Sequence, residues 1–386
     1  MSRVEAAEQI RAKALPMYVE TISEEAGFAE LAGSWDELVR AMPRPSPFLL
    51  HSWLLEWWRH YGRGADLAVH VAYRGDHLVG ALPLCARRRS GLRVSEFVGG
   101  TWAILADALV APGEDAQSVV GALAARAVEG KHDFADLFGL PGSSRLVAAL
   151  PQDSLRLVQR LEAPVCDLGP SWEAAYTSRL SSKTRSERRR RLRQLEKLGT
   201  VESEVARSRE EIARAVEDAF VVHDQRWSGR RDASGFTTET GKRFHRAALL
   251  ALADQDAARG LTIRLDGRPI AFSLYLQLAG RSYGMNMAFD PAYGSYGPGS
   301  EAKLQAIEAS WSEGIRRIEL LGTAAEHKRR FTDRFEPVYE GIGLARTWRG
   351  RAAMGALLAG IRLRRALKRS KTARRIYNRA PRAAHG

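Results

Sequence analysis

The stretch that decides the fold runs from residue 284 to residue 331 and reads GMNMAFDPAYGSYGPGSEAKLQAIEASWSEGIRRIELLGTAAEHKRRF. Alternating apolar side chains from Tyr283 to Phe289 predict a β-strand, and a loop rich in glycine, proline and tyrosine follows. Apolar residues then recur at helical spacing until Gly314, which is typical of a helix end. Ile318 begins a further strand. The predicted order is therefore strand, glycine-rich loop, helix and strand.

The loop residues Tyr296, Gly297, Pro298, Gly299 and Ser300 are the predicted binding site for an anionic cofactor. Backbone amides at a helix start have no partner within the helix, and the helix dipole favours negative charge there. A tight turn without a ligand would also explain these residues, because Gly/Pro turns before helices are common.

An equivalent order of elements precedes this region, which indicates a duplicated α/β unit. Asp76 and Asp266, each in a predicted hairpin turn, lie 190 residues apart, and the helix-ending Gly130 and Gly314 lie 184 residues apart. The first copy carries Glu114 and Asp115 before its helix, where they would repel a phosphate. We therefore expect the second copy to bind the cofactor.

Length and composition are those of a soluble globular protein with more than one domain. The chain has 386 residues, of which 45% are hydrophobic and 27% charged. We predict a flexible lead-in over residues 1–21, a first domain over 22–165, a second over 166–345 and a basic tail over 346–386. The two cysteines lack metal-ligand spacing, so no metal is expected, and the N-terminus does not resemble a signal peptide, so we expect a cytoplasmic protein.

Most of the net charge of +14 is located in the tail. From Arg346 onward there are thirteen Lys or Arg and no Asp or Glu, so the preceding residues carry only about +1. Met354, Leu357 and Ile361 fall at helical spacing in this tail. A basic amphipathic helix can lie on an anionic membrane. A solubilising, disordered tail would have the same composition.

A strongly basic helix is predicted between the two copies. The segment from Lys183 to Lys197 holds eight basic and two acidic residues, with Leu192 and Leu195 forming an apolar side. It would either bind phosphate through arginine or lie in solvent while packing on its leucines. Another helix follows and ends near Trp227.

These features together resemble the GNAT acyltransferase superfamily, and more narrowly its CelD/BcsL-like branch, associated with cellulose and exopolysaccharide biosynthesis and related to FemAB-type tandem GNAT proteins. The residues that carry the resemblance are Pro47-Phe48-Leu49, Trp53, Trp57-Trp58, Leu78 to Leu84, the Arg-rich segment before Gly199, His223, Arg226-Trp227, Phe289-Asp290, Tyr296 to Gly299, Gly322, Glu326 and Lys328. One departure is His327, where an aromatic residue is expected. The resemblance covers residues 35–331.

The resemblance implies two tandem GNAT-like domains with mixed, mainly antiparallel sheets flanked by helices. It also implies direct acyl transfer from acyl-CoA, such as acetyl-CoA, to an amine or hydroxyl of a small-molecule or saccharide acceptor. Such a reaction needs a base for the acceptor proton and a donor for the departing thiolate. The candidate catalytic residues are Glu326, ranked first as the base, His223, Asp224 and Tyr293; the candidate substrate-binding residues are Arg226, Trp227 and Lys328. His223 and Asp224 equally suit a structural role at a helix end.

Two other functions remain open at this stage. A FemAB-like enzyme would take its acyl group from aminoacyl-tRNA, although the long helical arm expected of many such enzymes is not evident. A non-catalytic module would bind nucleic acid or a membrane through the basic segments. Since the chain outside the tail is nearly neutral, we do not expect a nucleic-acid partner. Peripheral contact with the inner face of an anionic membrane is expected only through the tail.

Overall fold

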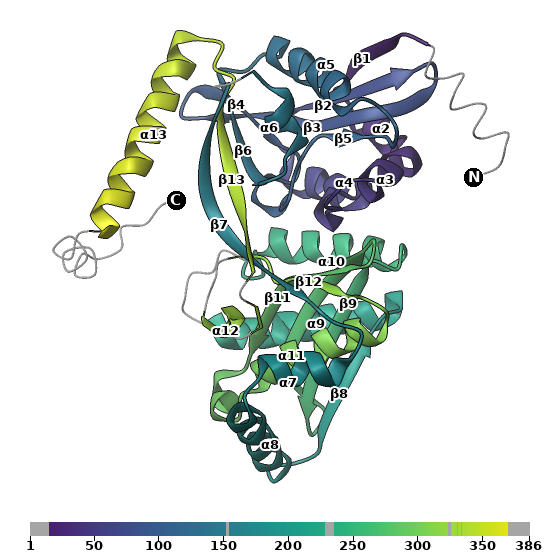
Figure 1. Cartoon of the computed structure of the whole chain (residues 1–386), viewed down its shortest axis with the longest axis vertical. Helices are drawn as coiled ribbons and strands as arrows, with labels where there is room; N and C mark the ends of the chain where they lie inside the picture. The colour runs from purple at the N-terminus through teal and green to yellow at the C-terminus, as the bar shows by residue number, and fades with distance from the viewer. Residues whose placement is uncertain are drawn as a thin grey trace.

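The computed structural model describes residues 15–151, 154–227, 235–322, 326–329, 331–332 and 334–369, except for the side chains of residues 326, 327 and 364–369. In this part of the chain, a 13-stranded mixed sheet runs through the molecule with helices on its faces (Figure 1). The strand order is β1-β2-β3-β4-β6-β13-β7-β12-β11-β10-β9-β8, with β5 attached to β3. The predicted mixed α/β fold is therefore confirmed.

The elements fall into two successive groups along the chain. The first group is β1 (Met17–Ile22), α2 (Glu25–Ala29), α3 (Ala32–Arg40), η1 (Pro47–Leu49), α4 (His51–Tyr61), β2 (Ala65–Arg74), β3 (His77–Arg89), β4 (Leu92–Phe97), η2 (Gly100–Trp102), β5 (Leu109–Val110), α5 (Ala116–Glu129), β6 (Phe134–Pro141), α6 (Arg145–Ala149) and β7 (Leu155–Asp167). The second group is α7 (Trp172–Arg179), α8 (Ser182–Glu196), β8 (Val201–Ala206), α9 (Arg209–Trp227), α10 (Glu239–Ala253), β9 (Ala258–Leu265), β10 (Arg268–Leu278), β11 (Arg281–Phe289), η3 (Pro291–Tyr296), α11 (Pro298–Ser312), β12 (Arg317–Glu319), α12 (Glu326–Arg329), β13 (Phe335–Gly343) and α13 (Trp348–Arg369).

The two groups share one repeated unit. In the first, β4 leads through α5 to β6, and β6 pairs parallel with β4. In the second, β11 leads through α11 to β12, and β12 pairs parallel with β11. In both units a hairpin of antiparallel strands comes before the helix, β2–β3 in one and β9–β10 in the other. The duplicated unit expected from the spacing of the turns is thus present.

The last strand joins the two halves. β13 lies between β6 and β7 and pairs antiparallel with both, although it follows β12 in the chain (Figure 1). β7 itself continues from its pairing with β13 to a pairing with β12. The boundary that we predict between residues 165 and 166 falls inside this continuous strand, and β1 begins within the predicted lead-in. The four-part division of the chain remains a prediction.

A buried ion-pair network also connects the halves. Glu319 on β12 is 0% exposed, and its carboxylate accepts bonds from Arg44 of the first half at 2.7 and 3.3 Å. Arg281 and Arg317 donate to the same carboxylate at 3.2 and 3.0 Å. The Tyr283 hydroxyl donates to the Pro45 carbonyl. Because a carboxylate without partners is costly to bury, Arg44 fixes the position of β12 relative to the first half.

The basic tail begins as the helix α13. Its apolar residues Met354, Leu357 and Leu358 pack with Ile361 against a cluster that includes Ile342 of β13. In the described part of the tail, these side chains are therefore used inside the protein, whereas Arg349, Arg351 and Arg362 are exposed. Of the helices that the structure describes, none is both long and apolar enough to cross a bilayer.

Candidate functional site

An open strand edge is the structural origin of the site. The parallel pairing of β11 with β12 covers Arg281 to Tyr283 and stops there. β11 continues to Phe289, and the stretch from Gly284 to Phe289 lines a cavity instead of pairing with β12. The pairing ends early because β12 has only three residues, whereas β11 is longer. The gap between the two strands gives a ligand access to backbone groups in the middle of the sheet.

The helices α9 and α11 lie on opposite faces of this sheet. On β10, Ala271 and Tyr275 pack in one cluster with Ala302 and Ala306 of α11. Phe272 and two leucines, which alternate with them along β10, pack in another cluster with apolar residues of α9. Since successive side chains of a strand point to opposite faces, the two helices cover different faces.

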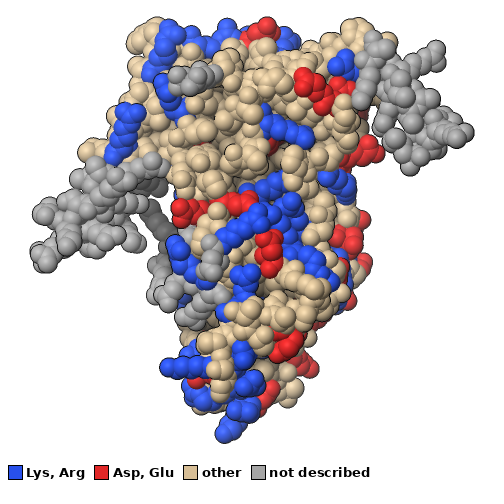
Figure 2. All heavy atoms as spheres, viewed as in Figure 1, with Lys and Arg blue, Asp and Glu red and all other residues tan. Residues whose placement is uncertain are grey.

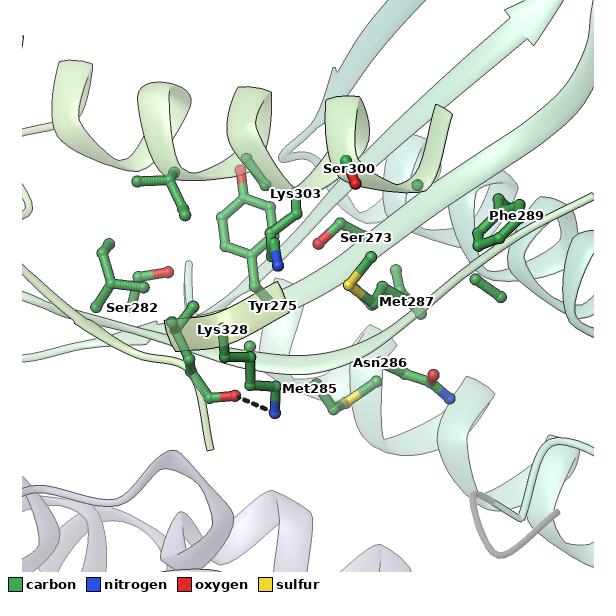
Figure 3. Close-up of a pocket in the computed structure, with 18 of the residues that line it drawn as sticks. Ser273, Tyr275, Ser282, Met285, Asn286, Met287, Phe289, Ser300, Lys303 and Lys328 are labelled. Atoms are coloured by element: carbon green, nitrogen blue, oxygen red, sulfur yellow. Dashed lines mark hydrogen bonds between the residues drawn. The ribbon is translucent and has the colours of Figure 1, made fainter. Parts of the chain in front are cut away.

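The main cavity has a volume of about 550 Å³ and reaches residues of both helices. Gly299, Ser300 and Lys303 of α11 line one part, and Arg226 and Trp227 at the end of α9 line another. The wall between them comes from β11, where Figure 3 shows Met285, Asn286 and Met287 in succession. The cavity therefore crosses the sheet at the open edge of β11, so that ligands on the two faces can meet there.

Lys328 presents an amine to this cavity (Figure 3). Its Nζ donates to the carbonyl oxygens of Leu320 at 3.0 Å and Leu321 at 2.5 Å, immediately after β12. Burial lowers the pKa of the Lys328 amine to about 8. The amine is thus mainly protonated at neutral pH, and it loses its charge about two pH units earlier than an exposed lysine would.

The predicted anion loop forms the turn into α11. Gly297 precedes the helix with φ of 71°, a left-handed conformation that suits glycine. A Cβ on Gly299 would lie 2.6 Å from Cδ1 of Phe289, so this position requires glycine to let helix and strand approach. The amides of Ser300 and Glu301 donate to the Gly297 carbonyl at 3.1 Å. The loop has the predicted shape, but these two amides already have an internal partner.

Helix α8 supplies the positive charge beside this loop. A second cavity of about 260 Å³, which we call the basic groove, lies between α8 and α11. It is lined by Lys183, Arg191, Gly297 and Lys303 among others. A Cβ on Gly297 would lie 3.4 Å from the guanidinium Nη1 of Arg191. Figure 2 shows Lys and Arg side chains gathered at the tip of the molecule where Figure 1 places α8. This groove and the main cavity share Ser300 and Lys303, so they adjoin.

Acidic side chains near the groove are already paired. Both oxygens of Glu301 accept from Arg188 at 2.6 Å, and Glu187 accepts from Arg190 and Arg191 at 2.7 Å. Arg188 thus neutralises the acid that follows the loop. Arg191 lies on the side of this helix that faces Gly297, and phosphate binding by the helix remains a prediction. Leu195 of the same helix is buried in an apolar cluster, so the predicted packing of α8 on its leucines is present as well.

The predicted site residues divide into those at the cavities and those away from them. Arg226, Trp227, Gly299, Ser300 and Lys328 line the main cavity, Tyr296, Gly297 and Ser300 line the basic groove, and Pro298 begins α11 between them. Of the other candidates with a described side chain, His223, Asp224 and Tyr293 do not line either of these cavities. His223 is 1% exposed and packs against Phe236, with ring centroids 5.2 Å apart.

Asp224 and Tyr293 also lie outside the cavity walls. The Asp224 side chain is 53% exposed and forms an ion pair with Lys242 at 2.8 Å. Tyr293 lies in η3 and packs against an apolar cluster that includes Tyr275. The Glu326 side chain lies outside the described residues; its backbone begins the short helix α12, which also carries Lys328. Its assignment as the base remains a prediction.

Sequence reasoning missed Lys303, which lines both cavities. Its side chain is only 7% exposed, and its Nζ lies 4.6 Å from the centre of the Phe331 ring. The sequence did contain a signal for Lys303. It lies on the same side of the helix as the small residues Gly299 and Ala306, and a lysine is unusual on a side that packs against a sheet. Ser273 and Asn286 were missed as well, because single polar residues in buried strands carry no distinctive pattern.

Comparison with known proteins agrees with this geometry. The family model described as an acetyltransferase (GNAT) domain matches residues 182–329, which include the described lining of the main cavity and that of the basic groove except Leu180 and Phe331. No curated protein matches the chain.

Solved structures similar to the chain include FemX, with a TM-score of 0.57, 13% identity, and coverage of 84% of this chain and 96% of FemX. They also include the C-terminal domain of a protein described as a lysylphosphatidylglycerol synthetase from Agrobacterium fabrum, with a TM-score of 0.51, 14% identity, and coverage of 87% and 95%. A tandem GNAT protein from the clavulanic acid biosynthesis pathway has a TM-score of 0.46 at 14% identity, with coverage of 86% and 100%.

The fold and the site therefore define an acyltransferase. Residues 182–329, which match the GNAT acetyltransferase model, have α11 and the open edge of β11 at their centre. Among the residues that the structure describes, no group of three or more His, Cys, Asp or Glu side chains could hold a metal.

Proposed function

We propose that this protein transfers an acyl group directly from acyl-CoA, such as acetyl-CoA, to an amine or hydroxyl of a small acceptor. The observation that carries this proposal is the course of the main cavity, which crosses the sheet at the open edge of β11 and continues into the basic groove. A donor lying along α11 and an acceptor entering beside α9 would meet at this edge without a covalent enzyme intermediate.

The residues around the groove fit the phosphates of coenzyme A. Positive charge comes from Arg191 and Lys183 of α8 and from Lys303 of α11. Gly297 has a left-handed backbone and no side chain, so a phosphate could approach the backbone of the loop closely. The diphosphate would lie over Tyr296 to Ser300. Most of its binding energy would then come from the side chains of α8 and α11, because the amides of Ser300 and Glu301 already donate to Gly297.

Lys328 is the residue best suited to stabilise the charge that develops during transfer. Its amine is held by two carbonyl groups and lines the main cavity. Acyl-CoA, when bound, supplies the activated acyl group as a thioester. A protonated Lys328 would stabilise negative charge on the carbonyl oxygen or hold an acceptor anion. Glu326, in the same short helix, remains our candidate base, ahead of His223 and Asp224, and Tyr293 our candidate thiolate donor.

Calorimetric titration with coenzyme A and acetyl-CoA tests the donor assignment. We expect micromolar binding to the unaltered protein and a loss of at least tenfold in a Gly297→Val, Gly299→Val double variant, because a side chain at residue 299 would displace Phe289. Gly267→Val, in a hairpin turn with open space around it, is the matched control for a bulky residue at a left-handed glycine. Absence of binding at millimolar cofactor would exclude an acyl-CoA donor.

A second donor, aminoacyl-tRNA, is favoured by one feature. Arg189, Arg190 and Arg193 are exposed on the outer side of α8, next to the groove, where they could contact an RNA backbone. Titration with tRNA over a salt series distinguishes the two donors, because RNA-backbone contacts give an affinity that falls steeply with salt. A module without catalytic activity would bind but would support transfer from neither donor.

We place the reaction in polysaccharide or cell-envelope biosynthesis, in the cytoplasm or at the inner membrane face. The support is the sequence resemblance to the CelD/BcsL-like branch and the exposed arginines of α13. Since Met354, Leu357 and Leu358 pack inside the protein, membrane contact would depend on charge and not on an inserted apolar face. Co-sedimentation with anionic vesicles at low and high salt tests this: we expect binding only at low salt, and loss of it after removal of residues 346–386.

A further inference from the structure

The charges around the main cavity are unbalanced. Its described lining contains Arg226, Lys303 and Lys328 but no Asp, Glu or His. Arg226 and Lys328 are half-buried, and a cation in such a position is stabilised by a nearby anion. Among the described residues, the buried arginines Arg44 and Arg259 have carboxylate partners in Glu319 and Glu313. The imbalance is thus a property of the cavity.

Arg226 is held in place without an ion pair. Its guanidinium lies over the Phe289 ring, 4.6 Å from the ring centre. Among the residues that the structure describes, no carboxylate lies within ion-pair distance of it. An arginine that stacks on an aromatic ring keeps the in-plane N–H donors available, and these match the oxygens of a phosphate or carboxylate.

The position of Arg226 separates it from the groove assigned to the donor. Arg226 and Trp227 end α9, on the face of the sheet opposite α11, and they line the main cavity only. Lys328 likewise lines the main cavity and not the groove, which has its own cations in Lys183 and Arg191. The two ends of the connected space therefore carry separate sets of positive charge.

We propose that the acceptor is itself an anion, with a phosphate or carboxylate group that Arg226 binds on the α9 side of the cavity while Lys328 stabilises the charge nearer to the reacting group. This inference rests on the proposed acyl transfer, because only that reaction makes the bound anion an acceptor. The anion site itself does not depend on which donor the protein uses. It excludes a neutral sugar or a simple alkyl amine as the preferred substrate.

Binding of small anions tests the site without knowledge of the substrate. Inorganic phosphate, acetate and the pair glucosamine 6-phosphate and glucosamine would be titrated by calorimetry into the full-length protein. Two charge-assisted hydrogen bonds are worth about tenfold or more in affinity. We expect glucosamine 6-phosphate to bind at least about tenfold more tightly than glucosamine, and phosphate compared with acetate to show which anion the site prefers.

Three variants locate the binding. Arg226→Met should weaken anion binding about tenfold or more and leave coenzyme A binding unchanged. Arg191→Met, on the donor side, should have the reverse effect. Arg214→Met is the control, because this arginine is 59% exposed on α9 and forms only a long ion pair with Glu204 at 3.5 Å.

The outcomes separate this inference from the proposed function. Anion binding that depends on Arg226, without any coenzyme A binding, would support the anion site and overturn the assignment of acyl-CoA as the donor. Equal binding of glucosamine and its phosphate, no anion binding at millimolar concentration, or an equal loss in Arg226→Met and Arg214→Met would overturn the anion site. A loss in Arg191→Met alone would assign the anions to the donor groove and overturn it too.

Discussion

The helices α5 and α11 occupy the same place in the repeated unit, but their environments differ. In the first half, Asp115 caps α5 by accepting from the Ser118 amide at 2.9 Å, and Val119 and Leu123 are fully buried against the sheet. In the second half, α11 begins at Gly297 without a side-chain cap, and a cavity of about 550 Å³ lies along it. One helix is packed closely against the sheet and the other borders a cavity.

This difference shows where the repeat carries function. Glu114 of the first half is paired with Arg74 and occupies the helix start with negative charge. The second half has glycine there, and its first acid, Glu301, is neutralised by Arg188. The same backbone arrangement thus stabilises the fold in one half, and in the other it is where we propose that an anion binds, according to the charge and size of a few side chains at the helix start.

The largest expected effect concerns Lys328, the cavity lysine of the second half. Lys328→Met should lower the rate of acyl transfer by about 100- to 1000-fold, because a fixed charge near the reacting group is lost. Folding should be unaffected or improved, since a partly desolvated amine is removed. Steady-state kinetics and thermal unfolding check this, with Lys197→Met on exposed α8 surface as the control. A rate equal to that of the unaltered protein would remove Lys328 from the mechanism.

The second effect tests the connection between the halves. Arg44→Met should lower the free energy of unfolding by about 3 kcal/mol, because Glu319 stays buried with one partner fewer. Urea unfolding followed by tryptophan fluorescence measures it. Arg40→Met is the control, since Arg40 is exposed and its hydrogen bond to the Asp36 carbonyl is long, at 3.3 Å. If both variants unfold alike, the network does not stabilise the contact.

A matched pair of glycine substitutions compares the two helices directly. A Cβ on Gly80 would lie 2.3 Å from Cγ1 of Val119 in α5, and a Cβ on Gly299 would lie 2.6 Å from Cδ1 of Phe289 beneath α11. Each change to alanine should cost about 1 to 3 kcal/mol of stability through overpacking. Only Gly299→Ala should also weaken coenzyme A binding. Weakened binding in Gly80→Ala would show that the first half influences the site.

The pH dependence of transfer should report Lys328. Its pKa is lowered to about 8, so the amine carries its charge below pH 8 and loses it above. If the charged form is active, kcat should fall as the pH rises through about 8, approaching about tenfold per pH unit. In Lys328→Met the residual activity should lack this step. A profile that is unchanged by the substitution would assign the titration to another group.

The smallest effect concerns the cap of the first helix. Asp115→Ala should cost about 1 kcal/mol of stability, as the loss of an N-terminal cap generally does. Transfer and coenzyme A binding should stay the same, because this helix lies in the half that we consider structural. Equilibrium unfolding and the titration described above measure both quantities. A change in affinity without a change in stability would contradict the division of roles.

The sequence predicted those parts of the fold and site that depend on local patterns. The alternation before Phe289, the glycines at 297 and 299 and the helical spacing after them are readable within about thirty residues, and α11 follows them. The repeat could be found because two turn landmarks recur at similar distances. Arg226, Trp227 and Lys328 were chosen by resemblance, and the structure brings them to one cavity.

The remainder depends on distant contacts that leave no local signal. Arg44 and Glu319 are 275 residues apart, and nothing in either segment indicates the partner. The insertion of β13 between β6 and β7 depends on pairing with strands about half a chain length away, which period and composition do not encode. His223 illustrates the reverse problem: its residue type suits catalysis, but its surroundings are an aromatic core.

The insertion of β13 has a consequence for synthesis on the ribosome. Because residues 335–343 are synthesised about 170 residues after β7, β6 and β7 exist before the strand that separates them. Until then both strands expose unpaired backbone groups, which favour association with other chains. The first half cannot complete its sheet alone, and a chain that stops before residue 335 would leave this gap open. This part of the sheet is therefore completed only after residues 335–343 have been synthesised.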